Sequence, residues 1–583
     1  MSIIFDRTRI LKNSLLAAVA LIATSQLGNA QSIPNDPQPT CTITPAAFKA
    51  FFEGGNVVLN GVVNPANSVD FSNIPNCPFY QWSEQMFLWL TSPAPPTYGN
   101  TGGRILDSSA FYDVSPPDQN GQRSFIPHFP GFIRHLSVRA AQAGPAGLPV
   151  LFDKTGRLLQ VAPPQTGPNG LPLVRNTAGD LVEVGRVAIG ADKQLVFSDP
   201  AGKAIEHRLT PADARFREIA PSQVVTAQQF IVNGKPILID PNGNVIDSEE
   251  GQADGGVLVA QTGSLVYYVT MVNDVYAYFL TGVKDQQIHT NNQFPTSQSD
   301  LNQITAFAAA HGKTFVDPNA LAIEVKSSWV EAGNLPNLGS YITMTATVPT
   351  YDKSNPLKWV PNGEKTVELA LVGMHVVGST AGHPEMIWST FEHFANAPNA
   401  AYSYNSTSGQ KTVNQSTAGT WVFTANNAAA PFNTARQQFV APDICVTSAS
   451  FGVCGASGTI GPSNTLRSKA WGAAANVSPN PIDGSATASN TEIISINDNV
   501  RGMMPAGDLR DNYFMTGATW TIGGAAPTGA NEVGTSKLAN TTMETFQQGA
   551  DNTTNNGSVN CFDCQISNLT SVSHVFGALK KLF

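Results

Sequence analysis

The stretch between residues 320 and 395 constrains the fold most, because it has the pattern of successive β-strands. The segment Ile323–Trp329 alternates apolar and polar residues at its start, as a half-buried strand does. Two further strands are predicted over Thr366–Val377 and Met386–His393, joined by a glycine-containing turn. Alternation of this kind favours antiparallel sheets with one covered face. We therefore predict an α+β fold with an antiparallel, β-rich core.

Helices are predicted near both ends of the chain. Thr44 has the side chain of an N-cap and is followed by Pro45, which suits the first helical position. Apolar residues recur at three- and four-residue steps over Tyr80–Leu90, which predicts an amphipathic helix. At the other end, we expect helices over Lys537–Gln548 and from about Ser573.

The region between residues 148 and 262 has a different pattern. Four short units each consist of an apolar run, a polar turn with glycine and a second apolar run, which is a β-hairpin signature. The turn glycines are Gly156, Gly179, Gly202 and Gly243. We therefore predict a β-hairpin-rich insert.

These patterns divide the chain into six consecutive parts. They are a signal peptide (1–30), an N-terminal helical and β part of the main domain (31–147), the β-hairpin insert (148–262), a central β-sheet core (263–400), a loop-rich segment (401–535) and a C-terminal helical segment with two cysteines (536–583). The loop prediction rests on the abundance of Asn, Ala, Gly, Thr and Ser in that segment.

The first thirty residues have the order of a secretory signal peptide. Arg7, Arg9 and Lys12 precede an apolar stretch over Leu15–Ala23, and small residues follow up to a cleavage site near Ala30. The apolar stretch is far shorter than the roughly 18–20 residues that span a bilayer. We expect an exported protein, periplasmic or secreted, without an integral membrane segment.

Composition narrows the range of partners. The formal net charge is −9, so the chain has no broad electrostatic attraction for nucleic acid or anionic lipid. Charged residues make up 13% of the sequence, about half of the usual share, which suits an exported, turn-rich protein with much β-structure. Nucleic-acid binding is therefore set aside.

The six cysteines fit an oxidising compartment, where structural disulfides are the default. Fifteen connectivities are open from the sequence alone. The pairing of sequence neighbours is Cys41 with Cys77 and Cys445 with Cys454, which leaves Cys561 and Cys564 as a Cys-x-x-Cys pair.

Two histidines lie on the predicted core strands. A symmetric hairpin places His375 opposite Trp388 and His393 about five residues further along, on the order of 17 Å at ~3.4 Å per residue. One metal ion at ~2 Å from each nitrogen cannot join them. Each histidine could act alone as an axial ligand or an acid/base, or be a hydrogen-bonded structural residue. The sequence has no Gly-x-Ser-x-Gly or His-Glu-x-x-His motif.

The segment Cys561-Phe-Asp-Cys564-Gln565 is the most informative short feature. Covalent haem attachment uses two cysteines at this spacing, but it requires a histidine directly after the second one to ligate the iron. Gln565 occupies that position and is a poor iron ligand. From these residues alone, a local disulfide, a redox-active dithiol and a haem remnant remain open.

Several collinear blocks, spread over most of the mature chain, resemble a family of large exported bacterial proteins described as cytochrome c family or uncharacterised proteins. The blocks are Trp82–Pro93, Val266–Asn273, Ile323–Trp329, Leu371–His375, Ile387–His393, Leu538–Thr545 and Cys561–Cys564. The resemblance implies one c-type haem near the C-terminus, held by a Cys-x-x-Cys-His motif. Cys561 and Cys564 match its attachment positions, and Gln565 departs from the histidine.

If a haem c is present, the resemblance leaves its axial ligands to other residues. His574 could replace the proximal ligand, and Met543, His375 or His393 could be distal partners. Two function classes follow. The first is a haem-containing protein that exchanges electrons with a redox partner. The second is a haem-less relative, an extracytoplasmic binding or surface-interaction module in which the two cysteines form a disulfide. Gln565 favours the second class, and a hydrolase lacks a recognisable nucleophile–base pair.

Overall fold

The computed structural model describes most of residues 33–583. Within this range it leaves out residues 73–75, 100–102, 117–121, 137–141, 144–148, 154–157, 162–166, 190–194, 207–225, 233–234, 240–244, 247, 250–255, 441–442, 448–453, 473–484, 529–530, 536–539, 547, 549–560, 565–566 and 574. The predicted signal peptide (1–30) lies outside the described residues. Among the residues described, no helix is long and apolar enough to cross a bilayer.

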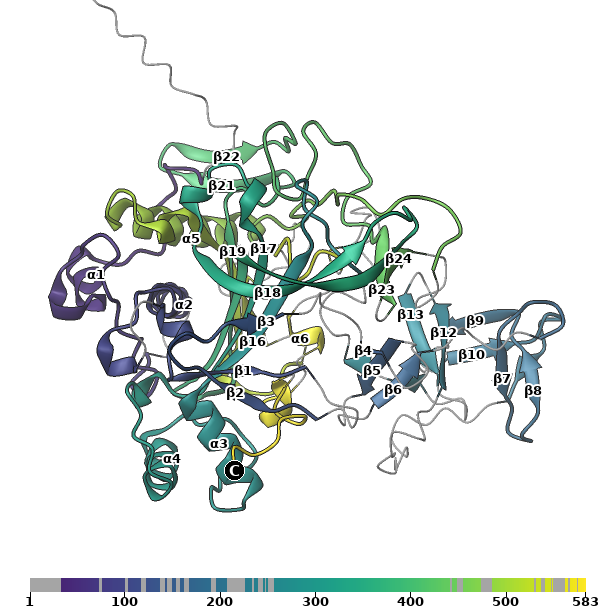
Figure 1. Ribbon diagram of the computed structural model, residues 1–583, viewed down its shortest axis with the longest axis horizontal. Coiled ribbons are helices and arrows are strands. Elements are labelled where there is room, and N and C mark those ends of the chain that lie inside the picture. Colours follow the sequence, from purple (N-terminus) through teal and green to yellow (C-terminus); the bar gives the residue numbers. More distant parts are fainter. Residues whose placement is uncertain are drawn as a thin grey trace, which may run out of the picture.

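A large, mainly antiparallel sheet forms the centre of the molecule and confirms the predicted α+β, β-rich fold (Figure 1). Its strands are β1 (Phe111–Val114), β2 (Phe125–Pro127), β3 (Arg134–His135), β16 (Val266–Asn273), β17 (Ile323–Glu331), β18 (Thr343–Asp352), β19 (Lys358–Thr380), β20 (His383–His393), β23 (Gln437–Val440), β24 (Asp443–Val446), β25 (Tyr513–Thr521) and β26 (Glu532–Gly534). The main order is β2-β1-β16-β17-β19-β20-β25-β26. The three strands predicted between residues 320 and 395 are β17, β19 and β20.

Helices pack against both faces of this sheet. They are α1 (Pro45–Phe51), α2 (Cys77–Leu90), α3 (Asp274–Lys284), α4 (Gln298–Ala310), α5 (Ala486–Met503) and the short α6 (Cys561–Cys564). The predicted start of α1 is confirmed, because the Thr44 side chain accepts a hydrogen bond from the backbone N–H of Ala47. The helix predicted over Tyr80–Leu90 is also present, and it begins three residues earlier, at Cys77.

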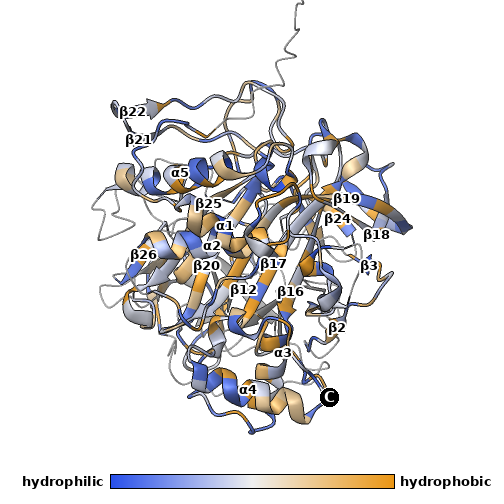
Figure 2. Cartoon of the chain, turned by 90° about the vertical axis from the view of Figure 1, so that its left-hand side faces the viewer, coloured by the Kyte–Doolittle hydropathy of each residue, from blue (hydrophilic) through white to orange (hydrophobic). Residues whose placement is uncertain are grey.

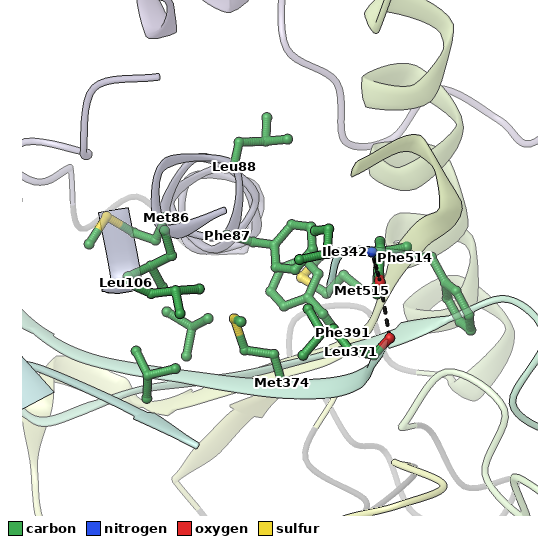
Figure 3. Packing of buried hydrophobic residues seen from close by; sticks show 14 of the residues in the cluster. Met86, Phe87, Leu88, Leu106, Ile342, Leu371, Met374, Phe391, Phe514 and Met515 are labelled. Carbon is green, nitrogen blue, oxygen red and sulfur yellow. Dashed lines mark hydrogen bonds between the residues drawn. The ribbon is translucent and has the colours of Figure 1, made fainter. Parts of the chain in front are cut away.

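One face of the sheet is apolar and lies against α2 and α5. Phe87 of α2 stacks on Phe391 of β20 with ring centroids 4.4 Å apart, and Met374 of β19 points to the same helix (Figure 3). Figure 2 shows the hydrophobic colouring of β16, β17 and β20, in contrast to the more hydrophilic hairpin of β21 (Tyr402–Ser406) and β22 (Gly409–Val413). Burial of this face explains why apolar residues recur at alternate positions, such as Ile323 and Val325 of β17.

The insert forms its own small sheets, on the right of Figure 1. Its strands are β4 (Gln142–Ala143), β5 (Pro149–Asp153), β6 (Leu158–Val161), β7 (Leu173–Arg175), β8 (Leu181–Glu183), β9 (Arg186–Ile189), β10 (Leu195–Ser198), β11 (Ala204–Ile205), β12 (Thr226–Val232), β13 (Lys235–Ile239), β14 (Val245–Ile246) and β15 (Ser248–Glu249). The four predicted hairpins are present as the antiparallel pairs β5–β6, β7–β8, β10–β11 and β13–β14.

The predicted disulfides between sequence neighbours are confirmed. Cys41 is bonded to Cys77 and Cys445 to Cys454. The first disulfide joins the segment before α1 to the first residue of α2, and the second closes a short loop after β24.

The segment 401–535 was predicted to be loop-rich, and it does include a stretch without helix or strand at residues 414–436, but regular elements are also present. It contains α5 and the fully buried strand β25. The polar residues that suggested loops make hydrogen bonds inside the protein: Asn497 donates to the carbonyls of Ile493 and Met515, and Ser495 donates to the carbonyl of Cys41. Buried polar side chains with internal partners are stable in a core, so composition alone misled here.

The C-terminal segment is less helical than predicted. The described residues from Asn540 to Phe546 form turns rather than a helix. The Asn540 side-chain oxygen accepts hydrogen bonds from the backbone N–H groups of Thr542 and Met543, at 2.9 and 3.0 Å. Such side-chain bonds compete with helix formation. Further on, α6 and the 3₁₀ turn η10 (Thr570–Val572) are short, and described residues after Ser573 form turns.

The hairpin of β19 and β20 has a different register from the symmetric one. At the turn, Thr380 lies opposite His383, as expected. A β-bulge then shifts the pairing by two residues, so that His375 lies opposite Thr390 rather than Trp388.

Candidate functional site

The second face of the central sheet carries a group of polar residues at its centre. We call these residues the polar strip: Tyr268, Thr270, Lys326, Ser328, His375, Thr390 and Glu392. They come from β16, β17, β19 and β20. The strand register places Lys326 next to Thr270 on one side and next to His375 on the other, and His375 next to Thr390. A continuous polar row therefore crosses four strands.

Apolar clusters lie at both ends of the strip. Along β16, the residues that face this side are Val266, Tyr268, Thr270 and Val272. Val272 belongs to an apolar cluster with α3 and α4, and Val266 belongs to a separate apolar cluster at the other end of the strand. Burying polar groups costs free energy unless they are hydrogen-bonded, so a polar centre between two apolar clusters requires partners for its polar groups. The polar centre is the reason to consider this face a site.

The segment Asn540–Phe546 covers the strip. The Asn540 side-chain amide donates to the Thr390 hydroxyl at 2.8 Å, and the Ser328 and Thr542 hydroxyls are 2.7 Å apart. The Tyr268 hydroxyl donates to the carbonyl of Thr542 at 2.5 Å. These contacts join residues that are 150 or more positions apart in the sequence, and they hold the covering segment on the sheet.

A buried ion pair anchors one end of this cover. Arg467 lies 3.1 Å from a carboxylate oxygen of Glu392, and both side chains are almost fully buried. The other Glu392 oxygen accepts the backbone N–H of Thr541 at 2.7 Å. Burial lowers the pKa of Arg467, while the charge of Glu392 opposes this effect. Glu392 thus links the sheet to both Arg467 and the covering segment.

His375 faces the cover directly. Its Nε2 lies 3.4 Å from a carboxylate oxygen of Glu544, and both side chains are buried. Beside it, the ammonium of Lys326 is 5.8 Å from the centre of the Tyr268 ring. An imidazole next to a carboxylate can hold or transfer a proton. His375 is therefore close to Glu544, the residue that directly follows Met543. Met543, another candidate from the sequence, is itself completely buried.

His393 does not join this site. It lies three residues beyond Thr390, the partner of His375, and an odd separation on one strand turns its side chain to the other face. Its ring stacks on Tyr341 at 3.7 Å, its Nδ1 accepts the backbone N–H of Ala395 at 3.1 Å, and its Nε2 is 3.3 Å from the Ser340 hydroxyl. Burial lowers the pKa of His393 to about 3, so the ring is neutral.

The Cys-x-x-Cys segment lies near one apolar end of the strip. Phe562 of α6 is buried in the same apolar cluster as Val377 and Trp388, which flank the strip on β19 and β20. Close by in the sequence, the Ser573 hydroxyl donates to Glu324 of β17 at 2.6 Å. The side chain of Cys564 and residues Gln565 and His574 lie outside the described residues. In the described part of the chain, no group of three or more His, Cys, Asp or Glu side chains is placed to hold a metal ion.

Two features were missed by sequence reasoning. The first is the covering role of residues 540–546, which no local pattern encodes. The second is Glu84 of α2, a buried carboxyl whose Oε1 has no hydrogen-bond partner among the described residues. Burial raises the pKa of Glu84 to about 8. A signal for it was present, because Glu84 is the one charged residue of the helix predicted over Tyr80–Leu90 and stands four residues from both Tyr80 and Leu88.

No family model, curated protein or solved structure matches this chain. The function is therefore argued from the residues of the site itself.

Proposed function

We propose that this chain is an exported, haem-less relative of the cytochrome-like family that it resembles, and that it acts as an extracytoplasmic binding protein through the polar strip. The absence of haem is proposed from the surroundings of the candidate iron ligands. Gln565 replaces the expected histidine, and both ring nitrogens of His393 face polar groups of the protein. His375 is close to Glu544. The replacement of the proximal histidine by Gln565, together with the internal partners of both His393 ring nitrogens, supports the haem-less proposal, because a haem iron needs an imidazole or thioether directed at it.

The binding role is supported by the character of the polar strip. Thr270, Lys326 and Thr390 are only half-buried, although they lie on the central sheet. Binding sites for small molecules combine apolar walls with a few converging polar groups, and the strip has apolar clusters at both ends. The ammonium of Lys326 and the two threonine hydroxyls suit a ligand with oxygen acceptors, such as a carboxylate or a polyol.

The haem-less state is tested by a visible absorption spectrum of the protein purified from a periplasm with an active cytochrome c maturation system. Mass spectrometry of the peptide with Cys561 and Cys564 accompanies it. We expect no Soret band and a peptide lighter than its dithiol form by two hydrogens, as a disulfide requires. A Soret band with a haem-mass adduct would overturn the proposal and establish a redox protein instead. The matched variant Gln565→His restores the family motif and shows whether a haem can be attached at all.

The binding role is tested by thermal unfolding in the presence of succinate, citrate and glucose. We expect at least one of them to raise the unfolding temperature, and Lys326→Met to abolish that increase. Lys353→Met is the matched control, because Lys353 lies against Trp359, away from the polar strip, with its ammonium 4.2 Å from the ring centre. No response of the unmodified protein, or an equal loss in both variants, would refute binding at the strip.

A further inference from the structure

A narrow crevice lies on the opposite side of the sheet, between α2, α5 and β25. It is lined by Glu84 together with Arg501, Arg510, Asp511 and Tyr513, and it has room for about one water molecule. A substrate cannot enter such a space. What can enter and leave is water and a proton.

Glu84 is the unusual group in this crevice. It is 4% exposed, and its Oε1 has no hydrogen-bond partner among the described residues. Desolvation by burial raises its pKa to about 8, so it is mainly a neutral carboxylic acid at pH 7. A buried, ionised carboxylate without a partner is strongly unfavourable, which is the physical reason for the bound proton.

The charged and titratable groups on the elements that pack against α2 determine what happens when the proton leaves. They are Arg104 and Asp107 at the 3₁₀ turn η3 (Ile105–Asp107), Glu492, Asp498 and Arg501 of α5, Asp508, Arg510 and Asp511 in and before the 3₁₀ turn η8 (Leu509–Asn512), Tyr513 of β25, and His383, Glu385 and His393 of β20. Asp498 also interacts with the charge of Arg501, and the His383 ring lies 4.9 Å from the ring of Phe79 in α2. β19 presents Met374 to this helix (Figure 3). Two of the arginines, Arg501 and Arg510, line the crevice together with Glu84.

Arg510 is fixed in place. Its guanidinium forms two hydrogen bonds to Asp508, at 2.8 and 2.7 Å, and a third to the Ser92 hydroxyl at 3.1 Å. The side chains of Arg510 and Asp508 are almost fully buried. Breaking this pair would leave a second buried charge without a partner, so Arg510 cannot be released to Glu84.

Arg501 is held much less firmly. It pairs with Asp511 at 3.1 Å, and each of these two side chains is 34% exposed. Solvent-exposed pairs of this kind contribute little to stability, because water solvates both partners when they separate. Arg501 also donates to the backbone carbonyl of Asp511 at 3.3 Å, and its guanidinium lies 4.6 Å from the centre of the Phe394 ring. A change of partner gives up these contacts, while an ionised Glu84 gains a great deal from a cation.

We propose that Glu84 and Arg501 form a proton-operated switch. With its proton, Glu84 is neutral and Arg501 pairs with Asp511. When the Glu84 O–H bond ionises, the proton leaves to solvent through the crevice, and the Arg501 guanidinium, which keeps its charge, moves from Asp511 to the new carboxylate. The end of α5 that carries Arg501 is drawn toward α2 by this exchange. The switch is independent of the polar strip, which lies on the other face of the sheet.

The test is an alkaline titration of the full-length protein from about pH 6 to about pH 10, followed by infrared spectroscopy and hydrogen exchange. We expect a protonated-carboxyl component of the infrared spectrum that disappears with a midpoint below about pH 8 in the unmodified protein and is absent from Glu84→Gln. The components of Asp274 and Asp317, whose pKa values burial raises to about 6, remain in both proteins. Exchange of the peptide that covers the end of α5, corrected for the intrinsic rate, should change with the same midpoint. Glu53→Gln, at an exposed glutamate, is the matched control and should behave like the unmodified protein.

Arg501→Met tests the exchange of partners separately. Without the cation, the ionised form of Glu84 loses its stabilising partner, so the midpoint should rise to about pH 8, the pKa that desolvation alone gives. An unchanged midpoint would overturn the role of Arg501. An equal carboxyl band at pH 7 in the unmodified protein and in Glu84→Gln, or an α5 response that persists in Glu84→Gln, would overturn the switch as a whole.

Discussion

Replacing Arg467 with methionine is expected to destabilise the protein strongly, because it leaves Glu392 charged and buried without a cation. In the intact protein the two side chains are 3.1 Å apart and at most 1% exposed. Methionine has a similar length and keeps much of the packing, so the change isolates the loss of charge and hydrogen bonds.

The magnitude follows from this burial. Removing one partner of a buried ion pair costs about 3–5 kcal/mol, because the remaining charge stays desolvated. Arg467 also donates to the side-chain oxygen of Asn399 and lies 3.4 Å from the Thr541 hydroxyl. Because these hydrogen bonds are lost as well, we expect the loss of unfolding free energy in Arg467→Met to lie at the upper end of that range. Since Glu392 also holds the backbone of Thr541, the covering segment should loosen as well.

Equilibrium urea unfolding at neutral pH, followed by tryptophan fluorescence, measures this loss. Arg501→Met is the matched control: its pair with Asp511 has the same distance of 3.1 Å, but the side chains are 34% exposed, so we expect a loss of only about 0–1 kcal/mol. The double variant Glu392→Gln with Arg467→Met should recover part of the loss, since no buried charge remains. Equal losses for Arg467→Met and Arg501→Met would refute the reasoning.

Two further predictions concern stability. Because the pKa of Glu84 is raised in the folded state, the stability that its bound proton provides is fully present below about pH 4.5 and is lost as the pH rises to about 8. Each pKa unit is worth about 1.4 kcal/mol, so Glu84→Gln should stabilise the protein by about 3 kcal/mol at pH 7 and by little at pH 4. Urea unfolding at both pH values measures the difference. Equal gains at the two pH values would contradict a raised pKa. Loop-closure entropy predicts that replacing Cys41 and Cys77 by serine costs about 4 kcal/mol, against about 3 kcal/mol for Cys445 and Cys454, because the sequence separations are 36 and 9. The same unfolding assay ranks the two double variants, and a larger loss for the shorter loop would contradict the entropic account.

Local features of the fold were predictable from the sequence. The N-cap at Thr44 and the glycine turns of the insert depend on a few neighbouring residues, and the structure has the expected helix and hairpins. Strand positions in the core were also predictable from neighbouring residues. The alternation of apolar and polar residues indicates which side chains can be buried. The pairing of cysteines close in sequence was also correct.

Predictions failed where side chains from distant segments decide the outcome. The polar sequence of α5 has the composition of a loop, but Asn497 and Ser495 find partners on β25 and at Cys41. Conversely, Asn540 turns a helix-like sequence into a set of turns that covers the sheet. Local propensity is weak compared with such tertiary hydrogen bonds.

The candidate site shows the same division. The sequence by itself marked His375, His393 and the Cys561–Cys564 pair as the residues to consider, since residue type and spacing suffice for that, and Met543 and His574 were added by the family resemblance. Only the tertiary structure decided that His375 lies in a polar strip beside Glu544 and that His393 faces the other side. The physical reason is that Glu544 comes from a distant covering segment, which no local pattern near His375 encodes. The two-residue register shift changes the cross-strand partner of His375 from Trp388 to Thr390, but it leaves both histidines on the same faces, because side chains alternate with a period of two.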